Sequence, residues 1–280
     1  MVLEKLRMDG PPRRVVIVTG GSRGLGKAMA ISLAEAGADI CIASRTLGQL
    51  ESAAAEIEAA GGRAPLIVPT NVQSSAECDA LVAKTVEHFG RLDVMLNNAG
   101  IGDRRGAGSR LWDLSDGDWQ DTIEVNLHST FYCSRAAARR MIERGGGGVI
   151  LNVASGTALR ATPNSFAYAA AKAGVISLTK SLAGMLVGED IRVNCIVPGY
   201  VAQQPPATEE DAERLRSRGR FNTVRRLGEA WELGPLAVFL CSDASSYVTG
   251  ESFIIDGGGI AGGIAPTGFV PEFAAGGTHA

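Results

Sequence analysis

Short runs of apolar residues alternate along this chain with longer segments that have helical periodicity. The runs Arg14–Thr19 (RVVIVT) and Asp39–Ser44 (DICIAS) are apolar almost throughout, which is typical of strands buried on both faces of a parallel sheet. Between them lies Gly24–Ala36, which is long enough for a crossover helix. Right-handed crossovers of this kind build a doubly wound sheet with helices on both faces. The sequence therefore predicts an α/β fold of the Rossmann type.

The alternation continues almost to the end of the chain and predicts a seven-stranded parallel sheet in a single domain. Strands are expected at Arg14–Thr19, Asp39–Ser44, Ala64–Thr70, Leu92–Asn97, Val149–Val153, Ile191–Val197 and Ser252–Asp256. Helices are expected at Gly24–Ala36, Leu47–Ala60, Ser74–Phe89, Trp119–Arg144, Ser165–Gly188 and Glu229–Cys241. We expect residues 1–13 to be a lead, 14–258 the domain with a substrate loop and short charged helix at about 200–226, and 259–280 a glycine-rich tail.

Composition argues against several classes of protein. A net charge of −3 over 280 residues gives no general attraction to nucleic acid or to an anionic membrane. The five cysteines are dispersed and odd in number, and with only three histidines they favour neither a disulfide framework nor a metal site. The N-terminus lacks the apolar run of a signal peptide, and no uninterrupted apolar stretch approaches the ~20 residues of a membrane span. The expected location is the cytoplasm.

The segment Thr19–Gly26 (TGGSRGLG) joins the first predicted strand to the first predicted helix. Glycine lets the chain turn tightly and lets the backbone approach a pyrophosphate, while the helix start offers free N–H donors. A purely structural turn is the alternative, but the position between a buried strand and a helix favours nucleotide binding. The residues expected to hold the nucleotide here are Gly20, Ser22, Arg23, Gly24, Leu25 and Gly26.

Cofactor preference is set at the end of the second strand, about twenty residues beyond the glycines. A carboxylate there would bind the ribose hydroxyls and repel a 2′-phosphate, but this chain has Ser44 and Arg45 instead. Together with Arg23, the position offers two guanidiniums suited to bidentate recognition of a phosphate. The alternative is that each arginine is merely solvated. The pair predicts NADP(H) as the cofactor.

In these features and in several further motifs the chain resembles the short-chain dehydrogenase/reductase family, in the common ~250-residue form typified by 3-oxoacyl-carrier-protein reductases. The resemblance runs from about Arg14 to Gly258. Beyond the glycine-rich turn, the matching motifs in family order are Asn97–Gly100 (NNAG), Asn126 within VNL, Ser155, Tyr168–Lys172 (YAAAK) and Pro198-Gly199.

The predicted catalytic set is Asn126, Ser155, Tyr168 and Lys172. Tyr168 and Lys172 are four residues apart and so share one helix face. A nearby ammonium and the positive charge of the oxidised nicotinamide would both lower the pKa of a tyrosine from its usual ~10, which suits it to acid/base exchange. Ser155 would donate a hydrogen bond to the substrate oxygen. The resemblance implies that Lys172 also holds the nicotinamide ribose and that Asn126 leaves a helix carbonyl free for a relay water.

The resemblance adds further cofactor contacts and two departures from the family pattern. The added contacts are Asn71, Val72, Asn98, Ala99, Gly100, Tyr168, Lys172, Pro198, Gly199 and Val201. Asn71-Val72 replaces a frequent Asp-Val, although the Asn71 amide oxygen could still accept from adenine. Gln203 stands where a threonine is expected to contact the nicotinamide amide. The segment Gly102–Gly117 is longer than in the simplest members, and with Trp112 and Tyr200 it could line the substrate pocket; a packing role for Trp112 is equally plausible.

Three functions remain open at this point. The leading hypothesis is reversible reduction of a small or alicyclic ketone, or of a sugar-like polyol's ketone. Reduction of a 3-oxoacyl thioester is the alternative, for which the arginines at 214, 216, 218 and 220 would form a docking patch rather than a solvated helix. A non-catalytic NADP-binding module is the remote third. A homotetramer, or a homodimer, is implied by the resemblance alone.

Overall fold

A computed structural model of the chain describes residues 3–102, 110–160, 165–204 and 206–262. Within them, seven parallel strands form one sheet in the order β3-β2-β1-β4-β5-β6-β9. Their bounds are β1 Val15–Thr19, β2 Asp39–Ser44, β3 Leu66–Pro69, β4 Val94–Asn97, β5 Gly148–Val153, β6 Ile191–Pro198 and β9 Ser252–Ile255. The predicted doubly wound α/β fold is confirmed.

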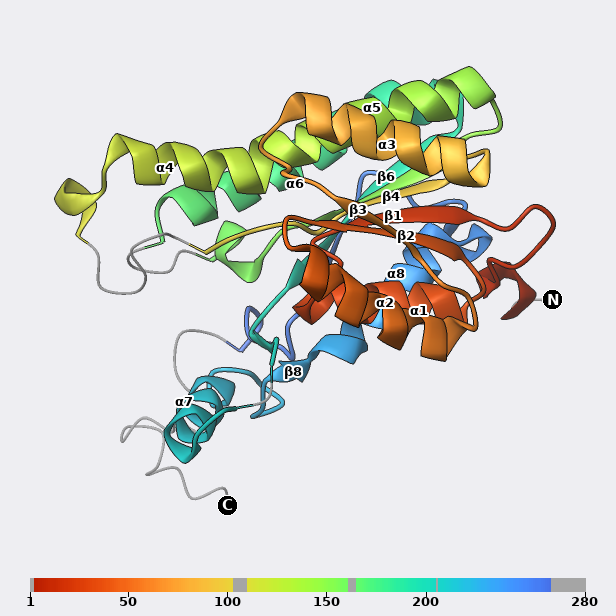
Figure 1. Ribbon diagram of the computed structural model, residues 1–280. Coiled ribbons are helices and arrows are strands. Elements are labelled where there is room, and N and C mark those ends of the chain that lie inside the picture. Colours follow the sequence, from red (N-terminus) through yellow and green to blue (C-terminus); the bar gives the residue numbers. More distant parts are fainter. Residues whose placement is uncertain (1–2, 103–109, 161–164, 205, 263–280) are drawn as a thin grey trace, which may run out of the picture.

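Helices cover both faces of this sheet (Figure 1). The helices are α1 Gly24–Glu35, α2 Leu47–Gly61, α3 Ser75–Phe89, α4 Asp116–Ile123, α5 Ser129–Arg144, α6 Ala167–Leu186, α7 Glu209–Gly219 and α8 Gly234–Cys241. One face carries α1, α2 and α8, and the other carries α3, α5 and α6 (Figure 1). Val16 and Val18 of β1 join the first core, while Val15 and Ile17 join the second. This alternation explains why a strand between two helical layers is apolar at every position.

Two predicted helices differ from the structure. The segment expected as one helix at Trp119–Arg144 begins earlier, at Asp116, and is interrupted by a π-turn at Glu124–His128 between α4 and α5. The segment expected at Glu229–Cys241 begins as a 3₁₀ turn, Ala230–Leu233, before α8. A small second sheet pairs β7 (Val201–Ala202) with β8 (Gly228–Glu229) and was not predicted, because two-residue strands carry no periodic signal.

Helix α6 is strongly apolar in composition. Residues Ala167–Glu189 are long and apolar enough to span a membrane by length and composition, with a mean hydropathy of 1.2. Lys172 and Lys180 lie within this segment. Val175 packs with Cys195 and Val197 of β6 in a shared cluster. Helix α6 is therefore a layer of this fold that lies against the sheet.

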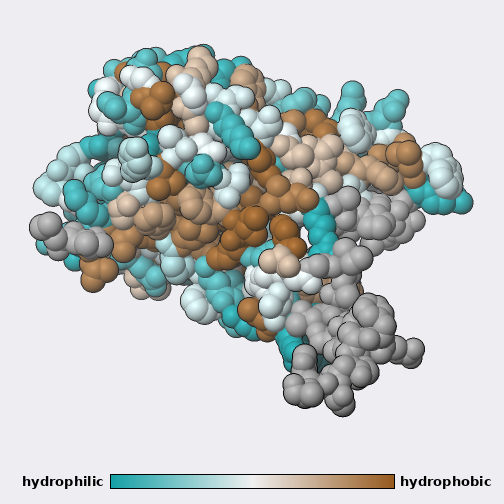
Figure 2. Space-filling view, turned by 180° about the vertical axis from the view of Figure 1, so that it is seen from behind, coloured by the Kyte–Doolittle hydropathy of each residue, from teal (hydrophilic) through white to brown (hydrophobic). Residues whose placement is uncertain are grey.

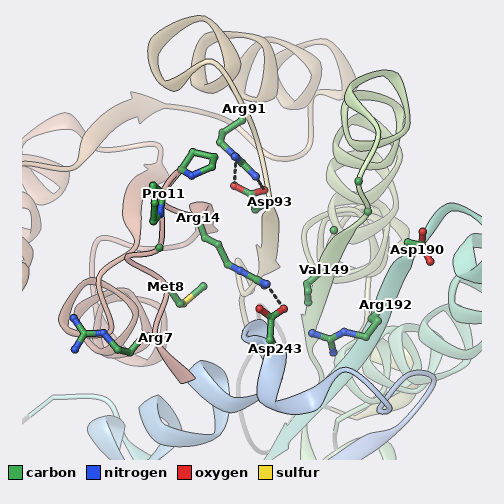
Figure 3. A pocket seen from close by; sticks show the side chains of 15 residues that line it. Arg7, Met8, Pro11, Arg14, Arg91, Asp93, Val149, Asp190, Arg192 and Asp243 are labelled. Atoms are coloured by element: carbon green, nitrogen blue, oxygen red, sulfur yellow. Dashed lines mark hydrogen bonds and ion pairs between the residues drawn. The ribbon is translucent and has the colours of Figure 1, made fainter. Parts of the chain in front are cut away.

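At the amino-terminal edge of the sheet, Asp93 joins segments that are distant in sequence (Figure 3). Its carboxylate accepts hydrogen bonds from the Val15 N–H at 2.8 Å, from Arg91 at 2.6 and 2.8 Å, and from Arg144 Nη1 at 2.6 Å. Nearby, Arg14 pairs with Asp243 beside a polar cavity of about 360 Å³ (Figure 3). The cluster fixes the starts of β1 and β4 and the end of α5, at the edge opposite the site described next.

Candidate active site

The glycine-rich turn lies at the carboxyl ends of β1 and β4, where the strand order reverses. Gly20 has φ +65°, and a side chain at Gly26 would collide with the Gly20 carbonyl and the Asn98 side chain. The Asn98 Nδ2 donates to the Thr19 carbonyl at 3.0 Å, and the Thr19 hydroxyl accepts from the N–H groups of Asn98 and Ala99 at 3.0 and 3.1 Å. The structure thus joins the predicted turn to the predicted Asn98–Gly100 motif. In sheets of this type the crevice at such a reversal is where ligands bind.

Ser44 and Arg45 lie at the carboxyl end of β2, next to the turn that carries Arg23. The Gly20 and Gly21 N–H groups both donate to the Ala43 carbonyl, at 2.7 and 3.3 Å, so Arg23 and Arg45 extend from neighbouring backbone. Both arginines are exposed, and within the described ranges neither has a carboxylate within 4.0 Å. The Ser44 hydroxyl is buried and has no hydrogen-bond partner there. Two exposed guanidiniums without carboxylate partners and one unpartnered hydroxyl, carried by neighbouring segments, are donors that fit a phosphorylated nucleotide.

Asn71 and Val72 follow β3, one strand further out. Val72 is buried in the second core, below the loop. The Asn71 Oδ1 already accepts from the Gln73 N–H at 3.2 Å, which leaves one lone pair for another donor. The Asn71 amide oxygen can therefore accept one further hydrogen bond, such as the one expected from adenine, and not two.

Tyr168 and Lys172 both lie on α6, as their spacing predicts. The Lys172 Nζ donates to the Val153 carbonyl at 2.9 Å and lies 5.7 Å from the centroid of the Tyr168 ring. Only 3% of the Lys172 surface is exposed. Burial lowers the pKa of Lys172 to about 8, because the interior disfavours the charged form. An ammonium that is poorly solvated by water interacts strongly with nearby anions.

Asn126 lies in the π-turn and is fully buried. Its Nδ2 donates to the carbonyls of Ile101 and Thr122 at 2.8 and 2.9 Å, and its Oδ1 accepts from the Ile101 N–H at 3.2 Å. A Cβ at Gly100 would lie 2.8 Å from the Asn126 Oδ1 and 3.5 Å from the Lys172 Nζ. The structure therefore brings Asn126, Gly100 and Lys172 together from three separate segments.

Ser155 follows β5 and opens onto a cavity of about 440 Å³. Its Oγ accepts from the N–H and the hydroxyl of Thr157 at 3.3 and 3.1 Å, so its own proton remains available for donation. The cavity is lined by Ser155, Gly156, Thr157, Arg160, Pro198, Gly199, Tyr200, Phe221, Asn222, Asp256, Gly259 and Ile260. Ser155 and the Pro198-Gly199 turn, predicted as parts of one site, thus share a cavity.

Several other expectations about this region have mixed outcomes. Tyr200 lines the cavity, but Trp112 is 77% exposed and neither lines it nor packs in a core. Val201, predicted as a cofactor contact, lies in β7. The Gln203 amide oxygen lies against Gly24 of the glycine-rich turn. The expected loop at 102–117 and tail at 259–280 fall partly outside the described residues, at 103–109 and 263–280.

Two of the four arginines of the predicted docking patch are paired with carboxylates of α7, which favours a solvated helix for these two, whereas Arg218 and Arg220 have no ion pair within the described residues. Arg214 contacts Asp211 at 2.7 Å, and Arg216 contacts Glu209 and Glu213 at 2.5 and 2.9 Å.

Arg160 lines the cavity beside Ser155 and was not predicted from the sequence. No motif marks it, and its place there depends on contacts between distant segments.

The chain is similar to known proteins in sequence and in fold. Residues 20–259 match the family described as enoyl-(acyl carrier protein) reductase. The 3-oxoacyl-[acyl-carrier-protein] reductase of Synechocystis sp. is 36% identical over 248 residues, which cover 88% of this chain and 96% of that protein. The 2-dehydro-3-deoxy-D-gluconate 5-dehydrogenase of Escherichia coli is 35% identical over 268 residues, covering 93% and 100%. Among solved structures, the NADPH-dependent 3-quinuclidinone reductase of Rhodotorula rubra matches with a TM-score of 0.82 and 31% identity, over 93% of this chain and 95% of that one.

Proposed function

The chain belongs to the short-chain dehydrogenase/reductase family, whose members are oxidoreductases that act on CH–OH groups with NAD(P)(H), and we propose that this member interconverts a ketone and a secondary alcohol with NADP(H). The observation that carries the proposal is the buried ammonium of Lys172 beside the ring of Tyr168. Burying that charge opposes folding, and an ammonium held beside a phenol favours the phenolate form of that phenol.

Proton transfer is assigned to Tyr168. In the reducing direction its phenol donates a proton to the substrate oxygen as negative charge develops there, while the Ser155 hydroxyl donates a hydrogen bond to the same oxygen. The Lys172 ammonium stabilises the resulting phenolate. Asn126 holds the chain around Ile101 against the helix and so fixes the floor of the site beside Lys172.

The cofactor is assigned to the crevice at the glycine-rich turn, where bound NADPH would supply the hydride. Ser44, Arg23 and Arg45 support a preference for the 2′-phosphate, since they offer donors and no competing carboxylate. The other residues assigned to the cofactor are Gly20, Ser22, Gly24, Leu25, Gly26, Asn71, Val72, Asn98, Ala99, Gly100, Tyr168, Lys172, Pro198, Gly199 and Val201.

A substrate screen tests the proposal. The loss of NADPH absorbance would be followed with a panel of ketones, and its gain would be followed with the matching alcohols and NADP⁺, with NADH and NAD⁺ in parallel. For the best substrate, Tyr168→Phe should lower kcat by about three orders of magnitude or more, near 4 kcal/mol of barrier, while NADPH binding stays near normal. A Tyr168→Phe rate within about tenfold of the wild type would refute Tyr168 as the acid/base.

A 3-oxoacyl thioester is the second candidate substrate class. The favouring observation is the 36% identity to the Synechocystis reductase. Comparing acetoacetyl-CoA with free ketones in the same screen decides between the two. A kcat/KM for the thioester at least about tenfold above every free ketone would favour the second class.

We further propose a homotetramer in the cytoplasm. Hydrophobic side chains gather across the middle of the face shown in Figure 2. Exposed apolar side chains on α6 and β9 include Met185 and Ile254, and Tyr247 is fully exposed just before β9. Exposed apolar area of this kind marks association surfaces. Light scattering on the purified protein would measure the assembly, and a monomeric mass would contradict it.

A further inference from the structure

The backbone after β5 carries both Ser155 and Arg160, and both residues line the same cavity. The Ala158 N–H donates to the Ser155 carbonyl at 3.0 Å, and the Arg160 N–H donates to the Gly156 carbonyl at 2.9 Å. The turn that begins at Ser155 therefore continues to Arg160. Gly156 lies against the Pro198 carbonyl, which a Cβ there would approach to 3.5 Å. Ser155 and Arg160 thus enter one cavity from the same short turn.

Arg160 is half-buried in this cavity and lacks an opposite charge. Its Nη1 donates to the Gly259 carbonyl at 2.9 Å, and no carboxylate lies within 4.0 Å of it in the described part of the chain. A guanidinium has five N–H donors, so one carbonyl uses a small share of its capacity. A partly desolvated, unpaired cation is costly unless an anion joins it.

The carboxylate that lines the cavity has other partners. Asp256 accepts from the Gly258 N–H on Oδ1 at 2.8 Å and from the Ile260 N–H on Oδ2 at 2.7 Å. Both oxygens therefore hold the backbone that follows β9. Among the described lining residues Arg160 and Asp256 are the charged ones, and Arg160 remains uncompensated.

We infer that Arg160 binds an anionic group of the substrate, so that the ketone whose oxygen is bound by Ser155 carries a carboxylate or a phosphate. The inference rests on the proposed ketone reduction and names its substrate class. A guanidinium binds either anion through two parallel N–H donors, which would orient the ketone toward Ser155 and select charged over neutral ketones.

Matched pairs of ketones test the inference, each pair differing in charge. Levulinate with methyl levulinate examines a carboxylate, and dihydroxyacetone phosphate with dihydroxyacetone examines a phosphate. The wild type should favour the charged member of at least one pair by about tenfold or more in kcat/KM. The pair that shows the preference identifies the anion.

Substitution of Arg160 separates substrate binding from loop support. Arg160→Met should lower kcat/KM for the charged ketone by about 10²-fold and leave the neutral partner within about threefold, while Arg160→Lys recovers part of the loss. The thermal midpoint and NADPH affinity of each variant report folding. Equal losses for both partners, or a wild type with no charged preference, would overturn the inference.

Binding without turnover distinguishes failure of this inference from failure of the proposed function. Calorimetry with the NADP⁺ complex, which has no hydride to transfer to a ketone, should show levulinate or dihydroxyacetone phosphate binding more tightly than its neutral partner, and Arg160→Met should remove the difference. If no ketone or alcohol is turned over, the proposed function fails. If neutral ketones are turned over and no anion is preferred in binding or rate, only the role of Arg160 fails.

Discussion

Arg23 and Arg45 offer a test of cofactor preference at the level of single residues. Each could donate charge-assisted hydrogen bonds to a 2′-phosphate, and such bonds contribute about 1.5–3 kcal/mol apiece. The double variant Arg23→Ala/Arg45→Ala should lower kcat/KM with NADPH by about 10²-fold and leave NADH within about threefold, because NADH lacks the phosphate.

The control for this prediction lies at the opposite end of β2. Arg63 is exposed and pairs with Asp39, the first residue of the strand, at 2.8 Å. Arg63→Ala should change neither rate appreciably. Equal losses with both coenzymes in the double variant, or an NADH preference in the wild type, would contradict the assignment of NADP(H).

Residues differ in how far sequence alone could place them. Gly20, Gly26, Tyr168 and Lys172 act through local spacing, so their arrangement could be predicted. Arg160 could not be predicted, because its position in the cavity depends on Gly259, 99 residues away.

Among the elements, the amino-terminal ends of β1 and β4 depend on one buried carboxylate. Burial alone would raise the pKa of Asp93, but hydrogen bonds from Arg91 and Val15 and the charges of Arg91 and Arg144 outweigh it and lower that pKa. A carboxylate whose folded pKa lies below its unfolded pKa near 3.8 stabilises the fold fully above that pH. The contribution is lost as the pH falls through the folded pKa.

Asp93→Asn should therefore lower the free energy of unfolding at pH 7 by about 2–4 kcal/mol, since it leaves two arginines without their partner. Urea unfolding measures the loss, which should shrink as the pH falls below about 4. Asp243→Asn is the control, because the Asp243 side chain is 57% exposed and its pair with Arg14 should contribute less than about 1 kcal/mol. Equal effects of the two substitutions would contradict a special role for Asp93.

The helices show which element features escape sequence analysis. Periodicity predicted the region of α4 and α5, but it could not predict the π-turn between them. The Asn126 side chain donates to the Thr122 carbonyl, four residues back, and so competes with the backbone for that acceptor. A tertiary contact to Ile101 holds the side chain there, and such contacts leave no mark in a local pattern.

In the molecule as a whole, stability and catalysis make opposite demands on Lys172. The ordinary pKa of lysine, 10.5, falls to about 8 on folding, so below pH 8 the folded protein carries a buried charge that opposes folding. The difference corresponds to about 3 kcal/mol. As the pH rises from 8 to 10.5 the folded state releases its proton first, and this opposition disappears.

Lys172→Met should therefore raise the free energy of unfolding at pH 7 by about 1–3 kcal/mol, after allowing about 1 kcal/mol for the lost bond to the Val153 carbonyl. The gain should vanish near pH 10, and turnover should fall below detection because the Tyr168 phenolate loses its cation. Urea unfolding of the apoprotein across this pH range provides the measurement. Lys180→Met, on the exposed side of α6, should alter neither property. A Lys172→Met protein that is less stable than the wild type at pH 7 would contradict this prediction. It would show that the buried ammonium stabilises the fold and that stability and catalysis favour the same residue.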